Sequence, residues 1–173
     1  MSTAIACTYY PSILNFPNIG FGPEFEGLKK YYDAEISEFR KAETLGRFLH
    51  EVLQSLDEVF KECSKEDWDG YGAFPITEDA YLETQRLIKS LPLTSFIPMP
   101  EITPEPDGSI GIEWSTGNRL IFVASVSGKN EIVYAGIFGM NKTHGAEYFG
   151  DSLPSAIIEN LRRMYSICKD WGC

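Results

Sequence analysis

Few side chains in this sequence are of the types that carry out acid–base or nucleophilic chemistry. Its 173 residues include two histidines and four cysteines. His144, in a predicted loop or short last strand, could act as a base beside an Asp or Glu, and Cys63 or Cys168 could supply a thiol nucleophile. No nucleophile elbow, phosphate-binding loop, metalloprotease motif or EF-hand loop surrounds them. A small hydrolase or transferase using His144 with a nearby carboxylate is one hypothesis for function.

Carboxylates are the commonest reactive groups, and four of them fall in a segment that is predicted to form hairpins. Pairing of strands would bring alternate members of this set together: Glu101, Glu105, Asp107 and Glu113. Glu113, beside Trp114, is the first of them to test, although a solvent-facing charge on a strand explains it equally well. The cysteines have neither CxxC nor zinc-site spacing, so we expect reduced thiols, no metal and no cofactor.

A second hypothesis starts from the segment Trp68–Ile76, which reads W-D-G-Y-G-A-F-P-I. Two glycines bend the backbone sharply, and the three aromatic residues supply more apolar area than a corner between helices needs. The aromatics must therefore be buried, either in the core as a plug or against a partner. The segment is not a dinucleotide-binding loop, because no strand precedes it and the third glycine is missing.

Charge favours a basic partner for this segment. The chain has a net charge of −10, and residues 33–69 alone hold eleven acids and five bases. This acidity disfavours direct binding to nucleic acid or anionic membranes, although acidity for solubility alone explains the excess too. We expect the following residues to bind a basic protein surface, such as that of a nucleic-acid-binding protein: Glu51, Glu58, Glu62, Glu66, Asp67, Trp68, Asp69, Tyr71 and Phe74.

Two motifs resemble those of small uncharacterised bacterial or phage accessory proteins. They are W-D-G-Y-G-A, from Trp68, and P-D-G-S-I-x-x-E-W, from Pro106. By analogy of class, the resemblance implies an inhibitor of the anti-CRISPR, antitoxin or immunity-protein type, which occupies a partner's basic surface and can mimic nucleic acid. It transfers no residue role. We therefore expect a noncatalytic binding protein, and the sequence is also compatible with a homodimer.

Two hydrophobic periodicities predict an α+β fold. Apolar residues alternate from residue 99 to 150 between Pro-Asp-Gly, Thr-Gly-Asn and Ser-Gly-Lys-Asn turns, which is typical of an antiparallel meander of four or five strands centred on Leu120–Val126. Apolar residues recur every three or four positions from Leu45 to Cys63, which predicts a helix from about residue 37 to 65. Thr77 is the expected N-cap of a second helix, which Pro92 ends.

The sequence predicts a single domain over 1–173, with an irregular aromatic and proline-rich arm (1–33), a helical part (34–92), the meander (99–150) and a C-terminal helix (152–169) packed on the sheet. The first residues lack the basic start of a signal peptide, and no apolar run is long enough to span a membrane. We therefore expect a cytoplasmic protein.

Overall fold

The computed structural model describes residues 23–92, 100–117, 119–150 and 152–171. The chain divides into two compact units, residues 1–40 and 41–173. This boundary falls inside the first helix and coincides with none of the divisions expected from the sequence. The elements run in the order α1 (Pro23–Cys63), α2 (Glu78–Ser90), β1 (Glu101–Pro104), β2 (Ile110–Ser115), β3 (Leu120–Val126), β4 (Glu131–Phe138), β5 (Asn141–Tyr148) and α3 (Ser155–Trp171).

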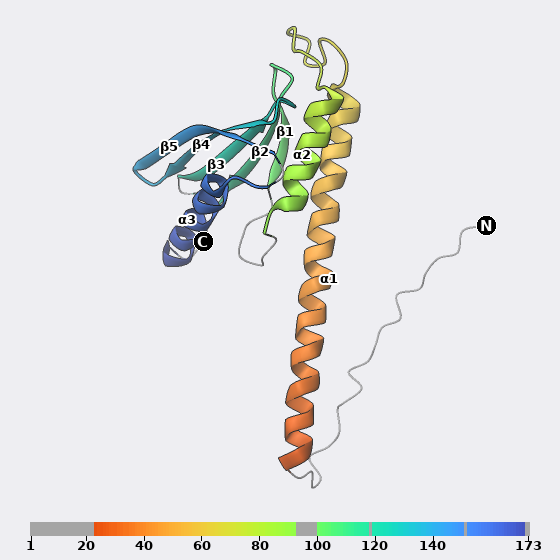
Figure 1. Cartoon of the computed structure of the whole chain (residues 1–173), viewed down its shortest axis with the longest axis vertical. Coiled ribbons are helices and arrows are strands. Elements are labelled where there is room, and N and C mark those ends of the chain that lie inside the picture. The colour runs from red at the N-terminus through yellow and green to blue at the C-terminus, as the bar shows by residue number, and fades with distance from the viewer. Residues whose placement is uncertain (1–22, 93–99, 118, 151, 172–173) are drawn as a thin grey trace, which may run out of the picture. The chain divides into compact units, whose positions relative to one another are not determined.

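The predicted antiparallel meander is confirmed. The five strands pair in sequence order, so that β3 is central and β1 and β5 are the edges (Figure 1). Phe122 on β3 lies opposite Trp114 on β2 and Gly136 on β4, which fixes the register at the middle of the sheet. The Pro106-Asp107-Gly108 turn joins β1 to β2 as expected, and Gly108 takes a positive φ of 86°.

One face of the sheet carries the hydrophobic core. In β3 every second residue is buried and the residues between them are half-buried. The largest fully buried side chains include Trp114, Phe122 and Phe138, whose rings contact one another through Phe122. Val52 and Leu56 of α1 join this core, α2 lies against β2 and β3, and α3 lies against β3 and β4. The α+β class predicted from the two periodicities is therefore correct.

The first helix begins earlier than the sequence suggested. We expected an irregular arm to residue 33, but α1 begins at Pro23. Proline lacks only an N–H that the first helical turn leaves unpaired, so it starts a helix without loss, and one glycine inside a helix costs only about 1 kcal/mol. Pro23 and Gly27 were therefore misread as breaks. Residues 1–22 of the expected arm lie outside the described residues.

The second helix follows its capping signals closely, whereas the third begins later than expected. Thr77 is the N-cap of α2, and its side chain accepts a hydrogen bond from the Ala80 N–H at 3.2 Å, as predicted. Leu91 is the C-cap, directly before Pro92. The C-terminal helix begins at Ser155 rather than at residue 152, so that Pro154 precedes the helix instead of lying in its first turn.

A buried acid joins α2 to the β3–β4 turn. Glu83 is 5% exposed, and its Oε2 accepts the Asn130 N–H at 3.2 Å, while Oε1 lies 3.8 Å from the Arg86 guanidinium. Gly128 of the same turn has a φ of 79°, and a Cβ there would lie 2.6 Å from the Ala80 nitrogen. The turn is thus fitted to the first turns of α2.

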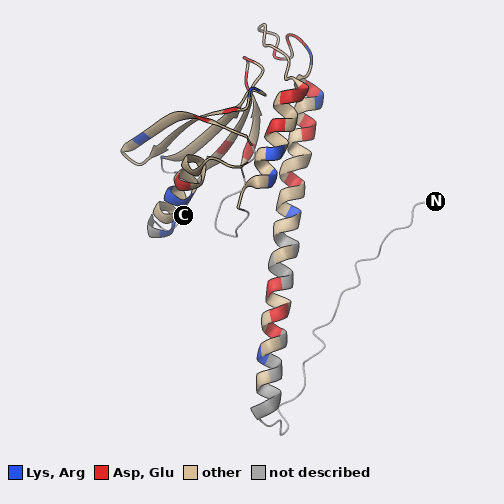
Figure 2. Ribbon diagram, viewed as in Figure 1, with Lys and Arg blue, Asp and Glu red and all other residues tan. Residues whose placement is uncertain are grey.

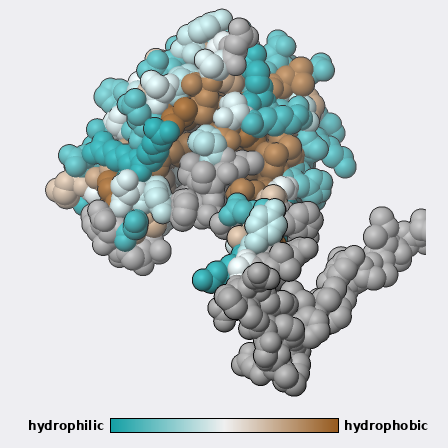
Figure 3. Space-filling model, turned by 60° about the horizontal axis from the view of Figure 1, so that its bottom comes forward, coloured by the Kyte–Doolittle hydropathy of each residue, from teal (hydrophilic) through white to brown (hydrophobic). Residues whose placement is uncertain are grey.

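No described helix is both long and apolar enough to cross a membrane. On the face of the molecule in Figure 3, apolar residues lie among hydrophilic ones.

Candidate partner-binding site

The loop between α1 and α2 is held in shape by two of the predicted site acids. Asp69 Oδ1 accepts the N–H groups of Tyr71 at 2.8 Å and Ala73 at 3.1 Å. Asp67 Oδ1 accepts the Gly72 N–H at 2.7 Å. Gly70 and Gly72 have φ of 74° and 91°, a conformation that side chains with a Cβ rarely adopt, so the two glycines are needed for the turn. The loop is therefore bound to itself by hydrogen bonds.

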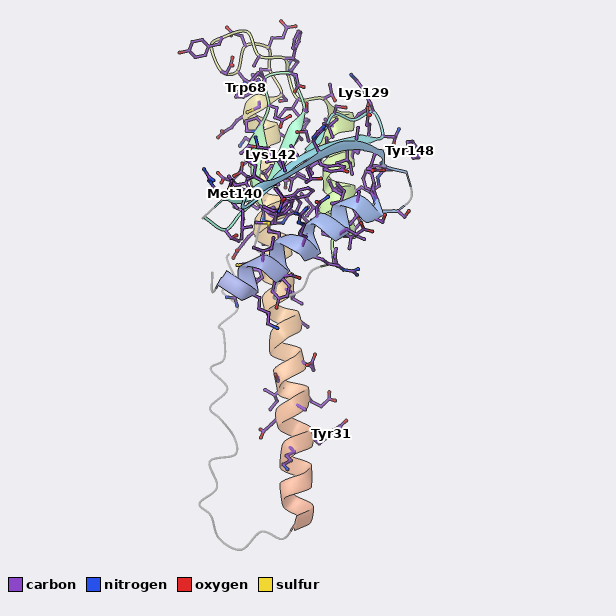
Figure 4. All side chains as sticks on the ribbon, turned by 90° about the vertical axis from the view of Figure 1, so that its left-hand side faces the viewer. Tyr31, Trp68, Lys129, Met140, Lys142 and Tyr148 are labelled. Carbon is purple, nitrogen blue, oxygen red and sulfur yellow. The ribbon has the colours of Figure 1, made fainter. Side chains whose placement is uncertain are left out.

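Trp68 ties this loop to the body of the protein. Its side chain is half-buried against the core, and its indole Nε1 donates a hydrogen bond to the Phe74 carbonyl at 3.0 Å. Backbone hydrogen bonds fasten the C-terminal end of the segment: Ile76 donates to the Cys63 carbonyl at the end of α1, and Phe74 donates to the Pro106 carbonyl in the β1–β2 turn. Trp68 lies on the packed side of the loop (Figure 4).

Tyr71 and Phe74 lie on the outer side. Tyr71 is 94% exposed and Phe74 is 68% exposed. We refer to these two residues as the aromatic tip. The backbone beneath them is fixed by the hydrogen bonds of Asp67 and Asp69, so the aromatic tip is presented by a shaped loop. The segment thus has a packed side, which holds Trp68 against the core, and an exposed side, which carries Tyr71 and Phe74.

The remaining predicted site acids form an exposed stripe that leads to this loop. Glu51, Glu58 and Glu62 are seven and four positions apart, which places them on one side of α1. All three are exposed, as is Glu66 beyond the helix end. The Gln54 amide donates to Glu58 Oε1 at 3.0 Å and belongs to the same side. Figure 2 shows acids along α1 and at the start of α2, whereas most strand residues are uncharged.

Two other carboxylates accept hydrogen bonds from neighbouring side chains of the protein. Asp57 accepts a 2.6 Å hydrogen bond from the Tyr81 hydroxyl, which joins α1 to α2 and raises the pKa of Tyr81, because the bond stabilises its protonated form. Asp107 accepts hydrogen bonds from the Ser109 hydroxyl and N–H, which lower the pKa of Asp107. Neither carboxylate needs a ligand to account for its position.

The residues considered for catalysis are dispersed. His144 lies in β5, the second of the two predicted alternatives; it is exposed and lies opposite Ala135. Burial, followed by the nearby Glu62 charge, raises the pKa of the Cys63 thiol, which makes it a poorer nucleophile. Cys168 is half-buried on α3.

Only some of the four hairpin carboxylates lie near one another on the sheet. Glu101 and Glu113 are paired across β1 and β2, and Glu105 Oε1 accepts the Ser125 hydroxyl at 2.7 Å. Among the described residues, no three His, Cys, Asp or Glu side chains are grouped so as to hold a metal ion.

One surface of interest was missed from the sequence. Val133, Ala135 and Ile137 lie on one side of β4, and the structure leaves that side exposed. The signal was present in β3 and β4, whose residues are apolar on both faces.

No family model matches the chain, and neither a curated protein nor a solved structure matches it significantly.

Proposed function

We propose that this protein is a noncatalytic inhibitor or binding protein that occupies a basic surface of a protein partner, in the manner of anti-CRISPR, antitoxin or immunity proteins. The observation that carries the proposal is the aromatic tip. Tyr71 and Phe74 are exposed on a loop whose backbone is fixed, so the cost of ordering them on binding is small. Exposed aromatic side chains of this kind are common energetic centres of interfaces.

The charges around the aromatic tip favour a basic partner. From residue 62 to 79 the chain has six acids and one base: Glu62, Glu66, Asp67, Asp69, Glu78 and Asp79, with Lys65. The acidic stripe of α1 extends this region. An aromatic centre with an acidic rim complements a basic surface with an apolar recess, such as a nucleic-acid-binding groove. Complementary rim charge mainly speeds association, whereas the aromatic anchors slow dissociation.

The proposal is tested by affinity capture from the source cell with the full-length chain as bait. We expect a basic protein whose retention falls at 1 M salt, where the Debye length is about 3 Å. The double variant Tyr71→Ala/Phe74→Ala should lose the partner and keep its melting temperature, because neither side chain is buried. Leu82→Ala is the matched control, since Leu82 is an exposed apolar residue (50%) on α2.

Two outcomes would contradict the proposal. One is a partner that the double variant still binds with full affinity. The other is the absence of a partner together with an enzymatic turnover that His144→Ala abolishes, which would favour the small hydrolase or transferase. No contact of His144 with a described carboxylate supports that alternative at present.

A further inference from the structure

The second face of the β-sheet carries exposed apolar side chains. We call this the open face, and within residues 41–171 no described helix packs on it. Figure 1 shows α3 on the opposite face, and Figure 4 shows β5 at the sheet edge with Met140 and Tyr148 at its two ends. Its exposed apolar members, with their exposed fractions, are Val133 (52%), Ile137 (39%) and Tyr148 (77%), and Ile121 and Val123 of β3 are half-buried. A sheet face that contacts only solvent is normally polar, so these exposed apolar side chains indicate a face that is covered by something.

The open face carries acids on β1, β2 and β4, where Glu131 lies opposite Tyr148, and bases on β5. Glu101 on edge strand β1 lies directly opposite Glu113 on β2, and like charges in that position repel. Lys142 and His144 lie on the other edge strand, β5. Glu101 is four strand spacings from the bases of β5, about 19 Å at about 4.8 Å each, and Glu113 is three spacings away, about 14 Å, so these acids and bases of one chain do not pair. They are also separated by more than a Debye length of about 8 Å at physiological salt.

The strand register shows how a second copy would bring the acids of one chain close to the bases of the other. One row across the open face runs Glu101, Glu113, Val123, Ala135, His144. A twofold axis parallel to β3, between two open faces, places β1 over the partner copy's β5 and each row over itself. Glu101 then faces His144 of the other copy, Lys142 lies one row away, and Val123 faces its own counterpart. An axis perpendicular to the strands would instead place β1 over β1 and glutamate against glutamate.

We propose that the open face is the interface of a homodimer, formed about a twofold axis parallel to β3. Apolar residues fill its centre, and the charges at its two edges are complementary only under this symmetry. Five strands of about seven residues give a face of about 550 Å² on each side, at the small end of specific interfaces. The dimer should therefore dissociate on dilution.

Analytical ultracentrifugation of the full chain tests the association. We expect a monomer–dimer equilibrium that Val133→Glu shifts to the monomer by at least tenfold in dissociation constant. Leu82→Glu is the control, because Leu82 and Val133 are almost equally exposed and Leu82 lies on α2. The melting temperature of each variant at low concentration separates loss of association from loss of fold. A folded chain that stays monomeric at several hundred micromolar, or a dimer that Val133→Glu leaves unchanged, would overturn the proposal.

Carbodiimide crosslinking tests the symmetry. This reagent joins a carboxylate to an amine with no spacer, so a link between Glu101 and Lys142, four strands apart, is expected only between two chains. Mixing isotope-labelled with unlabelled protein shows by mass spectrometry that the link is intermolecular. Glu101→Lys/Glu113→Lys should weaken the dimer, and adding Lys142→Glu/His144→Glu should restore it. A charge-reversed double variant that dimerises more tightly would show glutamates facing each other and would overturn this arrangement.

Discussion

At the scale of single residues, Glu83 is the most informative acid in the structure. Burial raises the pKa of its carboxyl, and the Asn130 N–H, the Arg86 charge and the Gly128 N–H only partly oppose this. The folded state therefore binds this proton more tightly than the unfolded state does, so protonation of Glu83 stabilises the fold. The contribution is therefore complete below the unfolded pKa, near 4.5, and is lost as the pH rises through the folded pKa.

Glu83→Gln should remove this pH dependence. Glutamine keeps an oxygen to accept the Asn130 N–H and carries no charge to desolvate. We expect the variant to be at least as stable as the parent at pH 7, with the advantage shrinking as the pH falls towards 4. Urea denaturation at both pH values measures this. A variant that loses more than about 1 kcal/mol at pH 7 would show instead that the ionised carboxylate stabilises the fold.

Trp68 and Tyr71 differ in role although they are three positions apart. Trp68→Ala should cost about 2 kcal/mol or more of unfolding free energy, because it removes both packing against the core and the hydrogen bond to Phe74. Tyr71→Ala should cost less than about 0.5 kcal/mol, as exposed substitutions usually do. Chemical denaturation of both variants decides this, and equal losses would refute the division of the loop into packed and presented sides.

Which residues carry these roles could be predicted only in part. The sequence of the loop indicated excess aromatic area, but choosing the buried member required the hydrogen bonds of Asp67 and Asp69, which involve partners up to five positions away. The burial of Glu83 could not be predicted, because it depends on a turn 47 positions further along the chain. Local patterns show period and capping, whereas the Asp67 and Asp69 bonds depend on the path of the loop and the Glu83 contact depends on tertiary structure.

At the scale of elements, the contact of the β3–β4 turn with α2 depends on one glycine. Gly128→Ala would place a Cβ within 3 Å of three atoms of Asp79 and Ala80, two of them backbone. We expect a loss of about 2 kcal/mol or more, from this overlap and from the left-handed φ. Gly117→Ala is the control, since Gly117 has a similar φ of 69° and a Cβ added there would meet nothing within 4 Å. If thermal unfolding shows equal losses, backbone strain alone explains them.

The elements themselves were largely predictable, and the errors have a common cause. Alternating apolar residues indicated the strands, and Thr77 indicated the start of α2. The start of α1 at Pro23 was wrong, because a breaker is also a good helix start, and the segment of His144 was left open between a loop and a short last strand, because a polar strand at a sheet edge lacks the apolar alternation of its neighbours. Whether a polar segment forms an edge strand depends on the strand beside it, and whether a proline starts or breaks a helix depends on its position in the helix. Composition alone records neither.

At the scale of the whole molecule, the core belongs to one of the two units. Every residue of the described core, and every half-buried residue packed against it, lies at Leu49 or later in the sequence. The acidic stripe, the aromatic tip and the open face lie in the same unit, residues 41–173. Folding, partner binding and dimerisation should therefore all be properties of that unit.

Removing residues 1–40 tests this directly. The chain that starts at Lys41 keeps 23 residues of α1, from Lys41 to Cys63, including the Val52 and Leu56 side chains that enter the core. We expect its melting temperature to fall by no more than about 4 °C, the shift that roughly 1 kcal/mol causes in a domain of this size. Partner capture and dimer dissociation should match the full chain. A larger fall in melting temperature would show that the first forty residues contribute to the folded core, and an unchanged melting temperature with lost capture would move the binding site into them.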